Sequence, residues 1–171
     1  GIILAEDCVN NVVSDNVVYA NQQHGIVLFL RSDHNTVQRN ESFNNGSQGI
    51  DVNASGTDTI SDNRVYANGE SGIGIGEQAQ GNVVERNDVR ANQQDGIRLV
   101  TRSAGTTVSD NIIGQNARYG VYADVADPFT LTGNTIYASR FGVAVTGGAA
   151  VPAETANTMF KNTDGNIRAA G

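Results

Sequence analysis

The segment ANQQHGIVLFLRSDHNTVQRN, residues 20–40, gathers side chains that are well suited to chemistry: two histidines, an aspartate and two arginines. Histidine exchanges protons near neutral pH, and arginine binds carboxylates through paired N–H groups. Such a set would suit proton transfer on an acidic substrate. However, residues 91–111, ANQQDGIRLVTRSAGTTVSDN, repeat most of the phrase without a histidine. The segment is therefore either a site or one unit of a scaffold.

Composition narrows the classes of function. The chain has 171 residues, enough for one domain with a substantial core. Its net charge of −7 argues against nucleic-acid or anionic-membrane binding, because both need excess positive charge. The single cysteine, Cys8, excludes an internal disulfide and does not support a zinc cluster. No segment is apolar for long enough to span a membrane, no signal peptide is found, and the start GIILAED suggests a trimmed chain.

A repeat of 22–24 residues runs through the chain. A glycine followed by an aliphatic residue recurs with spacings of 24, 24, 23, 24, 24 and 22 residues. The glycines are Gly1, Gly25, Gly49, Gly72, Gly96, Gly120 and Gly142. A fixed period of this length is typical of a solenoid, in which equivalent positions of successive repeats stack on one another.

Asparagines recur with the same period as the glycines, in two columns. The first column is Asn16, Asn40, Asn63, Asn87, Asn111 and Asn134. The second, five residues later, is Asn21, Asn45, Asn68, Asn92 and Asn116, followed by Ser139. Because equivalent positions stack, we expect the asparagines to form hydrogen-bonded ladders. We also expect asparagine and glycine to supply the positive φ angles of the turns.

The pattern of apolar residues predicts the fold. Aliphatic residues recur three positions before the first asparagine column and, with one exception, two positions after it. Each repeat thus holds three short β-like stretches, such as GIVL, NTVQ and ESF, and none has the period of a helix. A leucine-rich repeat would need leucines that are absent here. The sequence predicts an all-β, right-handed, single-stranded parallel β-helix of about seven coils with three short strands per coil.

One column carries charges of alternating sign. The residues immediately before the first asparagine column are Asp15, Arg39, Asp62, Arg86, Asp110 and Gly133. In a β-helix they would be neighbours on the surface, so we expect a chain of ion pairs that fixes the register of the coils. This role removes Arg39 and Arg86 from the candidates for ligand binding.

Residues 1–171 are expected to form a single β-helix domain. Residues 1–145 are the regular coils, 146–154 (TGGAAVPAE) an insertion, and 155–171 a last coil with the C-terminal end. In that coil we match Asn157 to Asn35, Met159 to the aliphatic position, Lys161 to the charge column and Asn162 to the first asparagine column. No capping helix precedes the first coil, so the chain is expected to be a fragment flanked by further coils or domains.

Where HGIVLFLRS follows DNVVYANQQ, the chain resembles a known family. The phrase DNVVYANQQHGIVL, residues 15–28, is similar to a coil of the mannuronan C5-epimerases, within the carbohydrate-binding and sugar-hydrolase (pectin-lyase-like) β-helix family. The resemblance implies a polysaccharide partner, an acidic one such as alginate, and a location in the periplasm, outside the cell or on its surface. It implies epimerase or lyase chemistry, in which a base and an acid act beside a group that neutralises the sugar carboxylate.

The family's Asp-Pro-His-Asp motif is absent at the matching positions. Those positions hold Ile3, Leu4, Ala5 and Glu6. The chain's only Asp-Pro, at residues 127–128, is followed by Phe129 and lies several coils away. No catalytic residues are therefore assigned, and a non-catalytic carbohydrate-binding or structural module is an open alternative. No metal ligands are assigned, and no calcium-binding GGxGxD repeat or other cofactor motif is found.

Two arginines and a histidine are the candidates that the resemblance adds. Arg31 follows the HGI phrase as the substrate-facing arginine of the family does, and Arg102 is its counterpart in the related coil; the alternative for Arg31 is a turn residue paired with Asp33. His24 lies just before the repeat glycine. The variety of residues at its position instead indicates an exposed turn.

Outward positions of the glycine-led strands supply the remaining candidates. The first set is Val27, Asp51, Gly74, Arg98, Tyr122 and Ala144; the second is Phe29, Asn53, Gly76, Val100, Asp124 and Thr146. Phe29, Asp51, Asn53, Arg98, Tyr122 and Asp124 would form a sugar-facing strip, unless this is an ordinary solvated face. Another column, Tyr19, Phe43, Tyr66, Arg90, Gly114 and Tyr137, is expected to stack rather than bind sugar.

Overall fold

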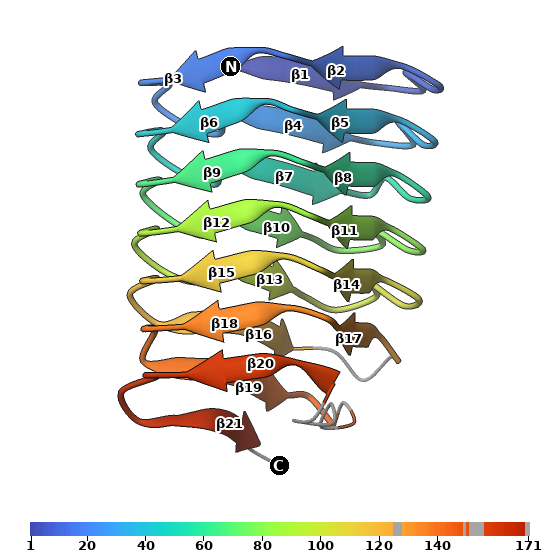
Figure 1. Cartoon of the computed structure of the whole chain (residues 1–171). Helices are drawn as coiled ribbons and strands as arrows, with labels where there is room; N and C mark the ends of the chain where they lie inside the picture. Colours follow the sequence, from blue (N-terminus) through green and yellow to red (C-terminus); the bar gives the residue numbers. More distant parts are fainter. Residues whose placement is uncertain (125–127, 149, 151–155, 170–171) are drawn as a thin grey trace.

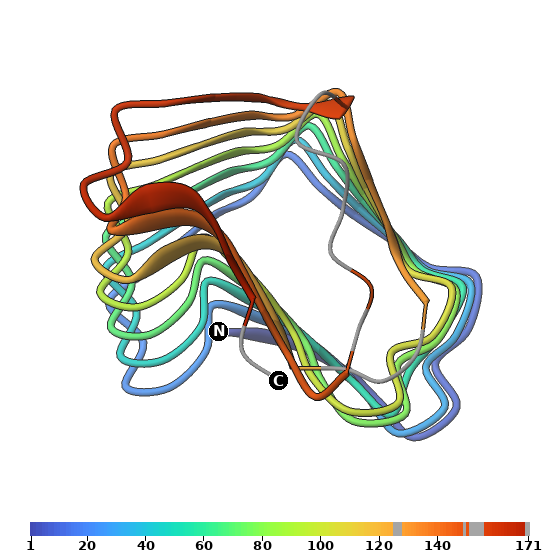
Figure 2. The same ribbon diagram turned by 90° about the horizontal axis from the view of Figure 1, so that it is seen from below.

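The chain folds as a solenoid of parallel β-strands (Figure 1). The computed structural model describes residues 1–124, 128–148, 150 and 156–169. Within these residues the secondary structure consists of short β-strands, three in each regular coil. Seen along the axis, the regular coils follow similar paths around one open centre (Figure 2).

Equivalent strands of successive coils form three parallel sheets. Sheet A contains β1 (Ile2–Ala5), β4 (Ile26–Phe29), β7 (Ile50–Asn53), β10 (Ile73–Ile75), β13 (Ile97–Leu99), β16 (Tyr119–Asp124), β19 (Phe141–Thr146) and β21 (Gly165–Ala169). Sheet B contains β2 (Val12–Ser14), β5 (Thr36–Gln38), β8 (Thr59–Ser61), β11 (Val83–Glu85), β14 (Thr107–Ser109) and β17 (Thr130–Thr132). Sheet C contains β3 (Val17–Tyr19), β6 (Glu41–Phe43), β9 (Arg64–Tyr66), β12 (Asp88–Arg90), β15 (Ile112–Gly114), β18 (Thr135–Tyr137) and β20 (Thr158–Phe160).

The core is a column of aliphatic side chains inside the coil. Each strand of sheets B and C has three residues, and only the middle one points inward. Sheet A contributes two inward residues per coil, such as Ile26 and Leu28 on β4, both of which are fully buried. In register, Leu28 lies beside Val52 of the next coil. The predicted coils, sheets and inward positions are confirmed.

The repeat glycine is required by close packing rather than by its φ angle. A Cβ atom on Gly96 would lie 2.5 Å from Cγ2 of Ile113 and 2.6 Å from the carbonyl oxygen of Gly120. Gly49 and Gly72 have the same surroundings in their coils, with a valine Cγ1 at 2.3 and 2.4 Å. The glycine thus lets the turn between sheets C and A pass directly over the core.

The asparagines form the predicted ladders. The Oδ1 atom of Asn40 accepts hydrogen bonds from the backbone N–H and the side-chain amide of Asn16, at 3.0 and 2.9 Å. The amide of Asn40 in turn donates to the backbone carbonyl of Val13 and to Asn63 Oδ1. A third column, which the sequence reading missed, contains Asn11, Asn35, Asp58 and Asn82.

Next to the two ladders, positive φ angles occur one residue before the ladder asparagine, which itself does not adopt them. The expectation that asparagine and glycine supply the positive φ of the turns is therefore confirmed at only some positions, such as Asn44, Gly81 and Gly133. In front of the first ladder the positive-φ residues are those of the charge column, such as Asp15, Arg39 and Asp62. In front of the second they include Ala20, Ala67 and Ala91. In each of these turns the residue with positive φ lies on the outside of the coil. The asparagine that follows it fixes the turn through the hydrogen bonds of the ladder.

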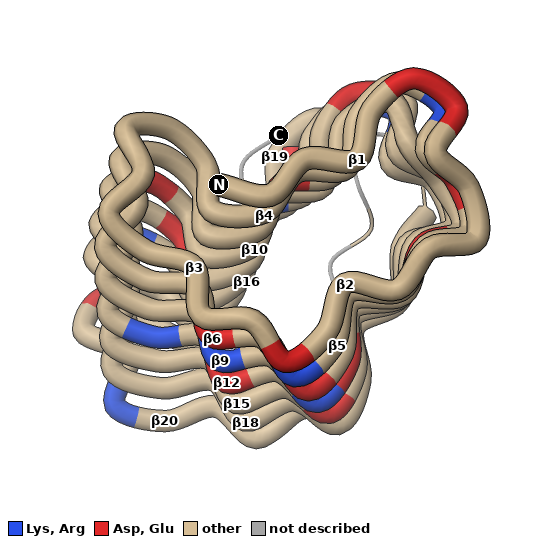
Figure 3. The backbone as a smooth tube through the Cα atoms, turned by 90° about the horizontal axis from the view of Figure 1, so that it is seen from above, with Lys and Arg blue, Asp and Glu red and all other residues tan. Residues whose placement is uncertain are grey.

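The charge column forms separate ion pairs rather than a continuous chain. The guanidinium of Arg39 binds both carboxylate oxygens of Asp15 at 2.9 Å, and that of Arg86 binds Asp62 at 3.0 and 3.1 Å. No ion pair within 4.0 Å joins Arg39 to Asp62. Each of these arginines is directed at the aspartate of the preceding coil, and Arg86 in addition binds Glu85 of its own coil at 2.6 Å. Figure 3 shows the alternating signs on successive coils.

In the last coil, the residues align with the preceding coil at positions five residues away from those that the sequence predicted. Asn157 Oδ1 accepts from the backbone N–H of Asn134, so it extends the first asparagine ladder. Met159 pairs with Ile136 in sheet C, and Asn162 extends the second ladder by accepting from Ser139. The match of Asn157 to Asn35, and with it the positions given to Met159, Lys161 and Asn162, is therefore wrong. Most of the predicted insertion, residues 149 and 151–154, lies outside the described residues.

Candidate functional site

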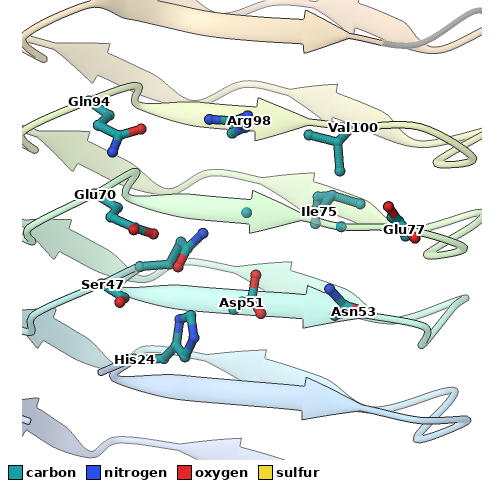
Figure 4. Close-up of a pocket in the computed structure, with 13 residues that line it drawn as sticks. His24, Ser47, Asp51, Asn53, Glu70, Ile75, Glu77, Gln94, Arg98 and Val100 are labelled. Carbon is teal, nitrogen blue, oxygen red and sulfur yellow. The ribbon is translucent and has the colours of Figure 1, made fainter. Parts of the chain in front are cut away.

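A groove of about 640 Å³ lies on the outer face of sheet A (Figure 4). It extends over four successive coils, from His24, just before β4, to Arg98 on β13 and Val100 just after it. Its lining residues are His24, Ser47, Gln48, Asp51, Asn53, Glu70, Gly74, Ile75, Gly76, Glu77, Gln94, Arg98 and Val100. The groove is open to solvent and its walls are mostly polar, which suits a hydroxylated ligand that crosses the strands.

Two glycines make the floor of the groove. Gly74 and Gly76 occupy the outward positions on and next to β10, where neighbouring coils carry Asp51, Asn53 and Arg98. A Cβ on Gly74 would lie 2.9 Å from Asp51 Oδ1, and one on Gly76 would lie 2.7 Å from Asn53 Nδ2. The side chains of the adjacent coil thus lean over the glycines. A coil without outward side chains creates the depression between two polar rows.

Asp51 is the half-buried carboxyl group at the centre of the groove. Burial raises the pKa of Asp51, and the nearby carboxylate of Glu70 raises it further, whereas His24 opposes both effects. The carboxyl therefore retains a proton to higher pH than an exposed aspartate does. A proton-bearing carboxyl can donate a hydrogen bond to a ligand oxygen as well as accept one from a hydroxyl.

The position before the repeat glycine is largely buried, so the prediction of an exposed turn at His24 is wrong. His24 is half-buried, and Ser71 and Asp95, at the same position in later coils, are 1% and 0% exposed. His24 Nδ1 and Gln48 Oε1 are buried without a hydrogen-bond partner among the described residues, and both residues line the groove. Buried polar atoms of this kind are normally hydrogen-bonded, so their lack of a partner marks these two groove residues as unusual.

A cluster of arginines and aromatic rings continues the face beyond the groove. The guanidinium carbon of Arg98 lies 5.4 Å from the ring centroid of Tyr122, and that of Arg118 lies 5.1 Å from the ring of Tyr119. The two tyrosine rings are stacked at 5.3 Å. Asp95 lies 4.0 Å from Arg98 and 3.9 Å from Arg118, too far to occupy their N–H donors. These guanidiniums keep donors for a carboxylate or hydroxyl group.

The structure brings together four of the nine predicted site residues: His24, Asp51, Asn53 and Arg98. Tyr122 does not line the groove, but its ring contacts the guanidinium of Arg98, which does. The Tyr122 hydroxyl oxygen lies 3.2 Å from Thr146 Oγ1. Asp124 accepts a hydrogen bond from the Thr146 hydroxyl at 2.8 Å. Phe29 and Arg102 are exposed and lie outside the groove.

Arg31 is separated from the other candidates. It lines a second groove, on the turn between sheets A and B, with Asp33 and His34. Its guanidinium binds both oxygens of Asp7 at 2.8 and 3.0 Å, so the predicted pairing with Asp33 is wrong. The partner lies 24 residues away because the coil above, rather than the same turn, is the nearest neighbour. This bidentate pair occupies the fork that would hold a sugar carboxylate.

The sequence reading missed the groove residues that lie outside strands. Ser47, Gln48, Glu70, Glu77 and Gln94 come from the turns that flank β7, β10 and β13. A signal was available: Gly74 and Gly76 stand alone in columns that otherwise carry side chains. The aromatic column, in contrast, behaves as predicted on sheet C, with Tyr19 stacked on Phe43 at 5.1 Å and Phe43 on Tyr66 at 4.9 Å.

Among the described residues, no group of three or more His, Cys, Asp or Glu side chains is arranged to hold a metal ion. The same part of the chain contains no helix of the length and apolarity that a membrane span requires.

The fold and the groove define a parallel β-helix protein with a ligand-sized depression on one sheet. A family model described as "Right handed beta helix region" matches residues 1–164. The chain therefore belongs to this family, and the predicted handedness is confirmed. Among curated protein sequences, none matches the chain.

Solved structures similar to this chain include three polysaccharide enzymes. The periplasmic alginate epimerase AlgG has a TM-score of 0.77 and 21% identity, over 100% of this chain and 42% of that one. The A-module of Azotobacter vinelandii mannuronan C-5 epimerase AlgE4 has a TM-score of 0.71 and 18% identity, over 95% and 56%. Pectate lyase Pel9A has a TM-score of 0.72 and 12% identity, over 90% and 50%. At these identities the likeness establishes the fold, and the chain spans about half the length of these proteins.

Proposed function

We propose that this chain is the polysaccharide-binding β-helix part of a polysaccharide-modifying protein that acts in the periplasm, outside the cell or on its surface. The observation that carries the proposal is the groove on sheet A, with its glycine floor and polar walls. A sugar ring offers hydroxyl groups around its edge, and the groove offers carboxyl, amide and guanidinium groups to match them. The similar solved structures include enzymes named for alginate and pectate, which supports this class of ligand.

The basic end of the groove supports an acidic sugar as part of the ligand. Arg98 lines the groove, and both Arg98 and Arg118 lack a carboxylate within normal hydrogen-bond distance among the described residues. Elsewhere, Arg31, Arg39 and Arg140 each bind a carboxylate at 2.6–2.9 Å. The aromatic rings beside Arg98 and Arg118 provide flat surfaces of the kind on which sugar rings pack.

Binding rather than catalysis is proposed for these residues alone. The positions that match the Asp-Pro-His-Asp motif lie on and next to β1, which pairs in register with β4. Three of the four, Ile3, Leu4 and Ala5, have no ionisable side chain. A modifying activity would then depend on coils beyond this chain.

The proposal is tested by affinity electrophoresis and calorimetry against mannuronan, pectate and neutral glucans at low ionic strength. The variant Gly74→Leu fills the floor of the groove, and the flexible Asp51 side chain can move aside. We expect at least about a tenfold loss of affinity with unchanged thermal unfolding. Thr107→Leu, on the outer face of sheet B, is the matched control and should bind as the wild type does. Absence of binding to every polysaccharide would reject the proposal.

Catalysis is tested in the same samples. Proton NMR of mannuronan follows inversion at C5, and absorbance follows unsaturated products. We expect no turnover by residues 1–171 alone. Turnover that Asp51→Asn abolishes would replace the binding function with an enzymatic one.

A further inference from the structure

The two halves of sheet A carry opposite charge. The half that contains β7 and β10 presents three carboxyl groups, those of Asp51, Glu70 and Glu77, and all three line the groove. Among the described residues, no Lys, Arg or His nitrogen lies within 4.0 Å of any of these carboxylates. This half therefore presents negative charge to a ligand.

The half that contains β13, β16 and β21 carries three guanidinium groups against two carboxylates, those of the buried Asp95 and of Asp124 on β16, so its balance of charge is positive. Arg98, Arg118 and Arg168 gather around the rings of Tyr119, Tyr122 and Phe141. The only described carboxylate within 4.0 Å of any of these guanidiniums is that of Asp95, which is fully buried. Arg168 donates to the Tyr119 hydroxyl at 3.1 Å and has no carboxylate within the same limit among the described residues.

The two halves are far enough apart to contact different sugar units. Asp51 and Arg98 occupy the same outward column, with Gly74 between them. Parallel strands lie about 4.8 Å apart, so two coils separate the acidic and basic groups by roughly 10 Å. A polysaccharide chain that runs along the groove would place successive sugar units against successive coils. The sugar that faces Asp51 is then a different unit from the one that faces Arg98.

We propose that the groove selects a heteropolysaccharide, with an uncharged sugar against β7 and β10 and a carboxylate-bearing sugar against β13 and β16. The inference rests on the proposed function and specifies the class of ligand. A homopolymer with a carboxylate on every sugar would place like charges against Asp51, Glu70 and Glu77. That repulsion acts at short range in a partly desolvated groove, where salt screens it incompletely.

Hexasaccharides of three kinds test the inference by calorimetry at pH 7.5. A block hexasaccharide with three adjacent glucose units followed by three adjacent glucuronate units presents neutral and acidic sugars to different coils, an oligomannuronate hexamer carries a carboxylate on every sugar, and cellohexaose carries none. We expect the block hexasaccharide to bind at least about tenfold more tightly than either of the others. Equal or tighter binding of the oligomannuronate, or of cellohexaose, would overturn the inference and leave polysaccharide binding standing. Failure of all three to bind, together with failure of the polymers, would reject the proposed function itself.

Variants assign the preference to the two halves. The triple variant Asp51→Asn, Glu70→Gln and Glu77→Gln should tighten oligomannuronate binding until it comes within about threefold of block-hexasaccharide binding. The double variant Arg98→Gln and Arg118→Gln should weaken binding of the block hexasaccharide to the level of cellohexaose. Arg39→Gln, whose guanidinium is paired on another face, is the control and should change neither. An unchanged preference in both multiple variants, with thermal unfolding intact, would also overturn the inference.

Discussion

The Ser55 hydroxyl lies 2.5 Å from the backbone carbonyl oxygen of Ser32 and 2.7 Å from Asp58 Oδ2. A hydroxyl has one proton, so it can donate to only one of these oxygens. If Asp58 carries a proton, it donates to Ser55, and Ser55 donates to Ser32. The coils on either side carry asparagines, Asn35 and Asn82, at the position of Asp58. The side-chain amide of an asparagine can donate hydrogen bonds, as a protonated carboxyl group can. The buried network is thus complete when Asp58 is protonated.

This relationship predicts a stability that falls with rising pH. Burial raises the pKa of Asp58 from 3.8 to about 6, and Asp33 adds to the effect, while hydrogen bonds from Asn35 and Ser55 and the charge of His34 oppose it. The native state therefore holds a proton that the unfolded chain releases near pH 4. Stability from Asp58 is fully present below about pH 4 and declines as the pH rises through about 6.

Asp58→Asn should remove that pH dependence. Above pH 7 we expect the variant to be more stable than the wild type by up to about 3 kcal/mol. Below pH 4 the two should unfold alike. Urea unfolding at pH 4 and pH 8 measures the difference. A parallel fall in stability for both proteins between these values would contradict the role given to Asp58.

The asparagine ladder makes a prediction for stability. Asn63 Oδ1 accepts two hydrogen bonds from Asn40, and its amide donates to the backbone carbonyl of Val37 and to Asn87. Asn63→Ala leaves these buried groups unpaired, so we expect a loss of about 2–4 kcal/mol in the free energy of unfolding. Asn44→Ala is the matched control, because Ala20 and Ala67 already occupy that position, with positive φ, in the coils on either side. A loss below 1 kcal/mol for Asn63→Ala would show that the ladder tolerates a missing rung.

The repeat glycine makes a second prediction for stability. Gly96→Ala places a Cβ against Ile113 and the carbonyl of Gly120, and the backbone there cannot yield easily. We expect a cost of about 2–3 kcal/mol from overpacking. Gly81→Ala, at φ +66° with its nearest contact at 3.5 Å, is the comparison and should cost about 1 kcal/mol from backbone strain alone. Thermal unfolding of both variants compares the two causes, and the reverse order would contradict the packing argument.

The charge column should contribute little to stability. Arg39 and Asp15 form a bidentate pair, yet their side chains are 52% and 60% exposed, so water and salt compete with it. We expect Arg39→Gln to leave the unfolding midpoint unchanged within error at physiological salt. The pKa of Asp15, which the Arg39 hydrogen bond lowers, should rise in the variant, as NMR titration would detect. A large loss of stability would show that the column does more than define register.

The sequence alone predicts the scaffold because the scaffold is periodic. Each core residue contacts its equivalents one coil away, so a column such as Val13, Val37 and Ile60 identifies both the inward position and its neighbours. The prediction was wrong for Asn157 and Met159, where the period of the repeat breaks. The sequence of residues 146–155 does not follow the repeat, so the position of the next coil cannot be found by counting residues. The prediction also failed for the pairing of Arg31, since a residue of the next coil competes with residues close in sequence.

The candidate site depended on tertiary structure for a different reason. The repeat determines that Asp51, Gly74 and Arg98 share an outward column, and that much is legible in the sequence. The depth of the groove, however, depends on how side chains such as those of Asp51 and Gln48 approach Gly74, and the identity of outward side chains is not periodic. The sequence by itself determined the fold, register and core of this protein, because stacked coils repeat the same contacts. Only the tertiary structure decided which outward groups meet, because side-chain direction and burial arise from all neighbouring coils at once.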